Sequence, residues 1–385
     1  MPSIEAHISP PVMQWARMKA GFDVFTAADK LKRPYEEIEK WESGEKKPTI
    51  AQVREAAKLY QRPLAVFFLT EPPTDFDVLR DYRHLPGTEG AKYSTNFLFL
   101  QRQIQDKFLW AREYLVSGGA EDLPFVGSAT LDDDVAELAR RIKNEINIDY
   151  SLQIGAKTAL NALNYWVFRV EESGINVLSS RDFPCQDARG FVISDGIAPF
   201  IYLNSNDTHT GQLFTLAHEL SHVWLGNSSI TTIEDMANKV NNNIVELFCN
   251  RVASHLLVER PLLRSLFNET DSSNPIFNRI SYVSKRLNVS NEVVARILLD
   301  DNAINAEEYG EIRAITVQFL KQQKQKTGGP HPILLKARKN GKLFCRTVLS
   351  AYNNGHVSGR DASSLLDTKI NHFSQLRHYS NHYSL

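Results

Sequence analysis

Residues 214–224 read FTLAHELSHVW, and this stretch decides which fold the chain carries. His218 and His222 stand four positions apart, and Glu219 directly follows the first of them. On an α-helix, residues four apart share one face and are separated by about 6 Å along the axis. The two imidazoles can therefore bind one ion at the roughly 2.0–2.1 Å that zinc prefers, with Glu219 beside them as a base.

A competing interpretation is an amphipathic core helix that carries two structural histidines, and the HExxH spacing alone does not exclude it. The surroundings of the motif favour a metal. Most of the other positions in 214–225 are apolar. Two histidines on such a helix are unfavourable unless something satisfies their ring nitrogens.

A second helical pattern, at residues 243–258, supplies a third ligand. Glu246 and Asn250 lie four apart on one face, among apolar residues. A hydrolytic zinc site needs a third protein ligand and an open fourth position. We expect Glu246 to complete the ligand set and Asn250 to hydrogen-bond the free ring nitrogen of a ligand histidine. Alternatively, both residues belong to a solvated helix face.

Three short strand candidates, GINVLSS, RGFVIS and APFIYLN, lead directly into the histidine motif. We expect the last, residues 198–204, to be an edge strand to which an extended peptide substrate adds. Three polar side chains are candidates to stabilise an oxyanion, although each is as compatible with packing or surface exposure. They are Tyr202, His209 and His255.

A chain of 385 residues is too long for one ordinary core, so several domains are expected. Residues 10–70 read as five short helices, with prolines near helix starts and glycines near stops. The predicted divisions are an N-terminal domain (1–72), a linker (73–95), a central domain (96–327) that ends in helix-turn-helix-like helices (279–301), and a small basic C-terminal segment (328–385).

Composition narrows the class of protein. No apolar run reaches membrane-spanning length, and the N-terminal MPSIEAHISPPVMQW lacks the features of an export signal. The three cysteines are widely spaced and suit a reducing compartment. A formal net charge of −1 predicts no global attraction to nucleic acid or membrane. We therefore expect a cytoplasmic protein without a membrane partner.

The span from about 190 to 261 resembles the ImmA/IrrE metallopeptidases. It contains a strand ending in Asn204, then GQLFTLAHELSHVWLG, then VELFCNRVASHLLV in place of the family's E-x-x-A-N-x-F-A. Cys249 and Val252 replace the usual Ala and Phe, and both are small and apolar. The resemblance implies an α+β zincin-like (gluzincin) core. In it His218, His222 and Glu246 would bind Zn²⁺, Glu219 would be the general base, and Asn250 would be the Asn of the pattern.

Residues 1–72 resemble a Cro/CI-type (XRE) helix-turn-helix domain, because IEKWESGEKKPTI is similar to the segment that closes its third helix. This implies a five-helix bundle that binds DNA. The presumed recognition helix PYEEIEKWES is acidic, however, although Ile38 and Trp41 should face inward. Four flanking cations could hold phosphates: Lys32, Arg33, Lys46 and Lys47. A dimerisation or substrate-docking module is the alternative.

The expected protein is multidomain and mainly α, with a small β-sheet. Its predicted function is that of a zinc-dependent endopeptidase that cleaves a specific regulatory protein by Glu-assisted attack of zinc-bound water. By resemblance, the substrate would be a partner repressor or antitoxin encoded nearby. The alternative is a DNA-binding transcriptional regulator whose peptidase-like domain is a sensor or docking module without turnover. Homodimerisation is left open.

Overall fold

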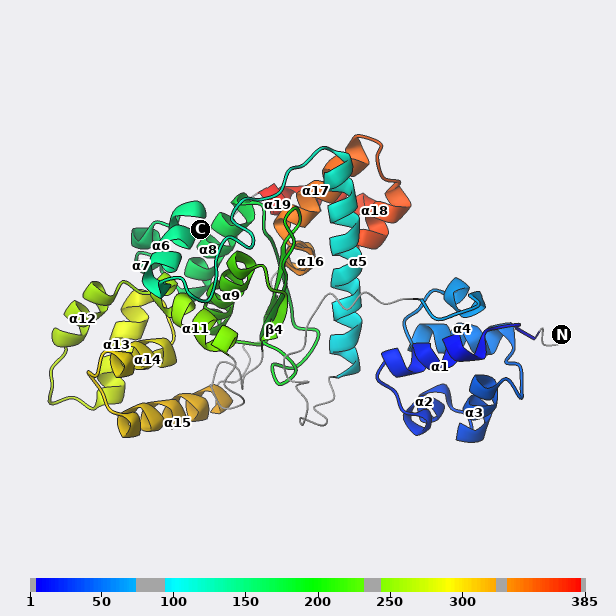
Figure 1. Ribbon diagram of the computed structural model, residues 1–385, viewed down its shortest axis with the longest axis horizontal. Helices are drawn as coiled ribbons and strands as arrows, with labels where there is room; N and C mark the ends of the chain where they lie inside the picture. Colours follow the sequence, from blue (N-terminus) through cyan, green and yellow to red (C-terminus); the bar gives the residue numbers. More distant parts are fainter. Residues whose placement is uncertain (1–4, 74–93, 232–243, 323–330, 382–385) are drawn as a thin grey trace. The chain divides into compact units, whose positions relative to one another are not determined.

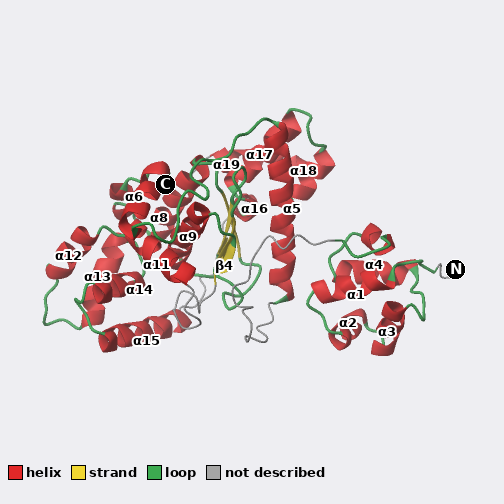
Figure 2. Cartoon of the chain, in the orientation of Figure 1, coloured by secondary structure: helices red, strands yellow, loops and turns green. Residues whose placement is uncertain are grey.

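The computed structural model describes residues 5–73, 94–231, 244–322 and 331–381 (Figure 1). These residues form two compact units, of which the first ends at Asp106 and the second begins at Lys107. Helices dominate, and the named strands form one small sheet (Figure 2). The chain is thus mainly helical with a small sheet, as predicted. The predicted linker, 73–95, lies almost wholly outside the described residues.

The first unit contains four α-helices and a 3-10 helix in the described part of residues 1–72. They are α1 (Pro10–Lys19), α2 (Val24–Leu31), α3 (Tyr35–Ser43), α4 (Ile50–Leu59) and η1 (Leu64–Phe68). Ile38 and Trp41 on α3 are 0% and 1% exposed, so their predicted inward orientation is confirmed. Arg17 and Glu42 join α1 to α3 through two short side-chain hydrogen bonds. Assignment of this unit to the XRE fold stays a prediction.

Helix α5 (Thr95–Ser117) runs from the first unit into the second. The elements that follow it and build the region around the histidine motif are α6 (Val135–Glu145), α7 (Tyr150–Ile154), α8 (Ala159–Glu172), β1 (Asn176–Ser180), β2 (Gly190–Ile193), β3 (Phe200–Asn204), α9 (His209–Leu225), β4 (Ser229–Thr231) and α11 (Ile244–Leu257). The predicted helix at 243–258 is confirmed as α11.

The sheet has the strand order β1-β3-β2-β4. Strand β3 pairs in parallel with β1 and antiparallel with β2, so it lies inside the sheet. The expectation that residues 198–204 form an edge strand is therefore wrong. All five residues of β3 are buried, which is typical of a strand paired on both sides and covered on both faces. The edge next to β2 is β4, and no other described strand pairs with it.

Helix α9 lies against this sheet and packs on α8 and α11, and α11 also packs on α6. Its side chains are buried almost throughout, because neighbouring elements surround it. Apolar residues from these elements form one continuous core with those of the helices that follow α11. The motif helix thus lies in the centre of the second unit.

After α11 come α12 (Arg260–Asn268), α13 (Ile276–Leu287), α14 (Asn291–Asp300) and α15 (Ala306–Gln322). The chain turns between α13 and α14 at Asn288, which has a left-handed backbone conformation, and Ser290 caps α14 through its side chain. This geometry matches the predicted helix-turn-helix-like helices at 279–301. The two helices lie beside α11 (Figure 1).

The C-terminal helices are α16 (Pro332–Asn340), α17 (Lys342–Asn353), α18 (Gly359–Leu365), a 3-10 helix η2 (Ile370–His372) and α19 (Phe373–Asn381). Helices α16 and α17 pack against β1 and so cover the opposite edge of the sheet from β4. Within the described part of the chain, no helix has both the length and the apolarity to cross a lipid bilayer.

Candidate metal centre

The two histidines of the motif lie in the middle of α9. Thr208 caps the start of this helix by accepting from the Gly211 backbone N–H, and Gly226 ends it in a left-handed conformation. Both imidazoles are 0% exposed, and their Nε2 atoms lie 3.1 Å apart. The four-residue spacing therefore brings the two ring nitrogens together, as helix geometry requires.

Glu246 projects from α11 onto the same point. Its Oε2 lies 3.0 Å from His218 Nε2, and its Oε1 lies 3.3 Å from His222 Nε2. One ligand atom from each residue falls within 4.8 Å of the others. Burial acts to raise the pKa of the Glu246 carboxyl, but the nearby His222 and His218 outweigh it and hold that pKa well below its usual range. The carboxylate is therefore ionised.

Asn250, one turn after Glu246 on α11, determines which His218 nitrogen faces the cluster. Its Oδ1 lies 3.0 Å from His218 Nδ1. An amide oxygen only accepts, so Nδ1 carries a proton, and in the neutral imidazole Nε2 is then the nitrogen that can bind a metal. The sequence predicted this partner for a ligand histidine, and the structure places it there.

The donor set fits a metal ion. Two buried imidazole nitrogens and a carboxylate converge, and neither Glu246 oxygen accepts a well-aligned hydrogen bond from a described residue. Electron-rich groups in this arrangement repel one another unless a cation lies between them. Two histidines and one glutamate form a ligand set that zinc uses in hydrolytic sites. The cluster is therefore a candidate metal centre.

Glu219 lies beside the cluster without belonging to it. Its side chain is 0% exposed, and its Oε2 accepts a hydrogen bond of 3.4 Å from Ser229 Oγ on the edge strand β4. On β2, a Cβ added at Gly190 would lie 3.3 Å from Glu219 Oε1 and would overlap the Thr215 side chain on α9. The carboxylate therefore faces the strands β2 and β4, and it belongs to the residue that directly follows His218 on α9.

Ser229 and Gly190 were not singled out from the sequence. Ser229 stands seven positions beyond His222, in a stretch with no helical or alternating pattern to place it. Gly190 did offer a signal, because a glycine at the start of an apolar strand often marks a close approach of another element. The contact with α9 that requires it follows only from the three-dimensional packing.

The three candidate oxyanion stabilisers are not near the cluster. The Tyr202 hydroxyl hydrogen-bonds Ser180 Oγ at 2.6 Å, and its ring stacks on Phe191. Since Tyr202 is paired with Phe191 and side chains alternate along a strand, it points to the face opposite that of Gly190 and α9. The structure gives no support to an oxyanion role for Tyr202.

His209 begins α9, nine residues and about 13 Å of helix before His218. Burial, with Arg338 and Arg181, lowers its pKa. His255 lies nine residues after Glu246 on α11, and its Nε2 lies 3.0 Å from Arg260. The structure brings neither histidine to the cluster.

The four cations proposed to hold phosphates lie around α3, and carboxylates engage two of them. Lys46 Nζ lies 2.7 Å from Glu37, and Arg33 lies 3.2 Å from Glu55. The remaining pair are Lys47, which lies 3.2 Å from His7, and Lys32, which is exposed at the end of α2. Contacts with DNA would have to displace these ion pairs, and the role remains a prediction.

A comparison with protein families bears on the chemistry of the cluster. Residues 170–299 match the model of the IrrE N-terminal-like domain family, Peptidase_M78. The matched region runs from the end of α8 into α14 and contains His218, Glu219, His222 and Glu246. It supports the ImmA/IrrE part of the resemblance and a metallopeptidase-type enzyme. None of the curated proteins compared with the chain matches it. The match does not reach residues 1–72.

Proposed function

We propose that the protein is a zinc-dependent endopeptidase that cleaves a specific regulatory protein. One observation carries this proposal: two histidines and Glu246 form a buried cluster, and the residue next to His218 in that cluster is a buried glutamate, Glu219. A site that only binds metal has no use for an acidic group in that position. The family match over residues 170–299 supports the same class of chemistry.

His218, His222 and Glu246 would hold the metal. A zinc ion there would supply Lewis acidity to the scissile carbonyl and to a water molecule. Glu219 would take a proton from the attacking water on one carboxylate oxygen and return it to the leaving amine. Ser229 orients this carboxylate by donating to Oε2, and burial excludes bulk water from it. Asn250 fixes the ring of His218.

Strand β4 offers the substrate an edge. An extended peptide can add to the outer side of β4 through main-chain hydrogen bonds, which would place its backbone next to Glu219. Main-chain pairing discriminates poorly between sequences. A peptidase built this way needs other surfaces to select its target, which supports a single protein substrate, by resemblance a partner repressor or antitoxin.

The alternative of a regulator without turnover has less support. The acidic helix α3 exposes Glu36 and Glu39, and two of the four flanking cations are bound to carboxylates of the same unit. Phosphates would be repelled by such a surface.

The experiment compares metal content with hydrolysis. Elemental analysis should find about one zinc per native chain and much less in His218→Ala and Glu246→Ala. Glu219→Gln should retain zinc but slow cleavage of the adjacent gene's product at least about 10²-fold, the usual contribution of a positioned general base. Full zinc retention in both ligand variants, or normal cleavage by Glu219→Gln, would overturn the proposal.

A further inference from the structure

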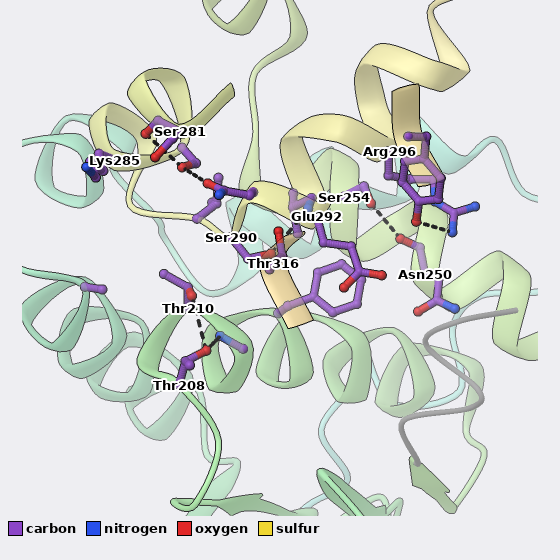
Figure 3. Close-up of a pocket in the computed structure, with 18 of the residues that line it drawn as sticks. Thr208, Thr210, Asn250, Ser254, Ser281, Lys285, Ser290, Glu292, Arg296 and Thr316 are labelled. Carbon is purple, nitrogen blue, oxygen red and sulfur yellow. Dashed lines mark hydrogen bonds between the residues drawn. The ribbon is translucent and has the colours of Figure 1, made fainter. Parts of the chain in front are cut away.

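A cavity of about 1140 Å³ adjoins the His218 side of the cluster. The first turn of α9 and the exposed face of α11 form one wall, and α13, α14 and α15 form the other (Figure 3). Asn250, which hydrogen-bonds His218, lines it, as does Phe214, whose ring lies 6.5 Å from that of His218. Its volume exceeds the roughly 300–1,000 Å³ of small-molecule sites, so it suits a segment of polypeptide.

The described lining carries more positive than negative charge. Five cationic side chains line the cavity, against two carboxylates. The cations are Arg189, Arg251, Arg260, Lys285 and Arg296, and the carboxylates are those of Glu292 and Asp300. Arg189 is committed to Asp207, Arg260 to Asp301 and Arg296 to the Tyr309 hydroxyl. Arg251 and Lys285 are exposed, and neither is hydrogen-bonded or ion-paired to a described residue. Both side chains are cationic and exposed at the cavity, so they can bind an anion that enters it.

Two helix starts add to this positive potential. The N-terminal turns of α9 and α14 both line the cavity, and each is capped by a hydroxyl, Thr208 on α9 and Ser290 on α14. The N-terminus of a helix carries a partial positive charge, which favours anionic groups nearby. The wall of α14 also contains Glu292, but this carboxylate lies 3.6 Å from Arg313.

We propose that this cavity is the substrate-selecting cleft of the enzyme and that it receives a segment of the protein substrate bearing aspartate or glutamate side chains. The inference rests on the proposed peptidase function. The cleft lies on the Asn250 side of the cluster, while Glu219 and β4 lie on the sheet side. A substrate strand paired with β4 can therefore pass the ligand cluster and place its next residues in the cleft.

Peptide carboxylates fit the cleft better than the phosphates of a nucleic acid. Asp300 and Glu292 interrupt the positive lining, and a phosphate backbone carries regularly spaced charges that cannot avoid them. A peptide can place its acidic residues opposite Lys285 and Arg251 and apolar residues opposite Phe214 and Phe277. The cleft thus combines the charge for recognition with the apolar surface that a peptide side chain can bury.

The test measures binding without turnover. Zinc-loaded Glu219→Gln protein is titrated with two labelled peptides of equal length and apolar content, one with glutamates and its twin with glutamines at the same positions. The acidic peptide should bind more tightly, and added salt should remove the difference. Lys285→Glu and Arg251→Glu should each weaken the acidic peptide by about fivefold or more, which matches the upper range for an exposed ion pair.

Arg286→Glu is the matched control. Arg286 is the exposed neighbour of Lys285 near the end of α13, but it does not line the cleft. A glutamate at position 286 puts a negative charge near the C-terminus of α13, as Lys285→Glu does, so both variants carry the same cost to the helix. Peptide binding should nevertheless be unchanged in Arg286→Glu. Equal binding of the two peptides, equal losses in Lys285→Glu and Arg286→Glu, or tighter binding of a single-stranded oligonucleotide would overturn the inference.

The two proposals fail in different ways. If the native protein cleaves peptides without a preference for acidic residues, the peptidase stands and the acidic specificity is wrong. If no peptide or neighbouring-gene product is cleaved, the proposed function fails. Selective binding of the acidic peptide, lost in Lys285→Glu but not in Arg286→Glu, would still establish the cleft as an acidic-peptide site.

Discussion

Asn250→Ala tests whether the residue supports a metal ligand or is merely part of a helix face. In the native protein Asn250 Oδ1 lies 3.0 Å from Nδ1 of His218, whose side chain is 0% exposed. Removal of the partner of a buried donor costs about 1–3 kcal/mol. That range corresponds to about 5- to 150-fold in an equilibrium constant, and loss of such an outer partner usually weakens metal binding about 10–100-fold.

The assay is competition for zinc between the protein and a chromophoric chelator. Alanine favours the helix more than asparagine does, so α11 should remain folded, which circular dichroism can verify. Asn250→Asp is the matched variant, because it keeps an acceptor oxygen and adds a negative charge near the cation. It should bind zinc at least as tightly as the native protein. Unchanged zinc affinity in Asn250→Ala would refute the reasoning.

Three further predictions concern stability in urea. Gly190→Ala should lower the free energy of unfolding by about 1–3 kcal/mol, because its Cβ would lie 2.4 Å from Thr215 Cγ2, and Thr215→Ser should restore part of the loss. Glu42→Ala should cost about 3–5 kcal/mol by leaving Arg17 buried without its carboxylate, and a near-neutral effect would contradict the pairing. Burial lowers the pKa of Lys107 from 10.5 to about 8, so between these pH values the native protein binds fewer protons than the unfolded chain. The free energy of unfolding, relative to that of Lys107→Met, should therefore rise by about 3 kcal/mol from pH 8 to 10.5. A difference that stays constant with pH would exclude the lowered pKa.

The helix with the two histidines could be predicted because its geometry is local. The spacing of His218 and His222 fixes their common face whatever the rest of the chain does. Glu246 could be predicted less directly. Its apolar neighbours indicate a buried helix, but they do not indicate which other element that helix packs against. The structure places α11 against α9. Asn250 followed from the same helical period, four positions after Glu246.

The sheet edge and the cleft could not be predicted in the same way. Strand order depends on contacts between distant segments, and residues 198–204 were assigned to an edge only because they precede α9. The continuous apolar run in β3 was the available signal for an interior strand. The cleft arises where α13 and α14 stand opposite α9 and α11. No residue pattern within any one of these helices encodes that opposition.

In the proposed enzyme, buried side chains carry the chemistry and exposed side chains carry the selection of substrate. The ligand cluster and Glu219 lie on α9 and α11, in the centre of the core, where a change in side-chain volume disturbs neighbours on every side. Lys285 and Arg251 project from exposed helix faces into the cleft, where substitution leaves the core intact. Exposed substitutions usually alter stability by less than about 0.5 kcal/mol. Changes at Lys285 and Arg251 should therefore alter which protein is bound while the zinc content and Glu219 remain as they are.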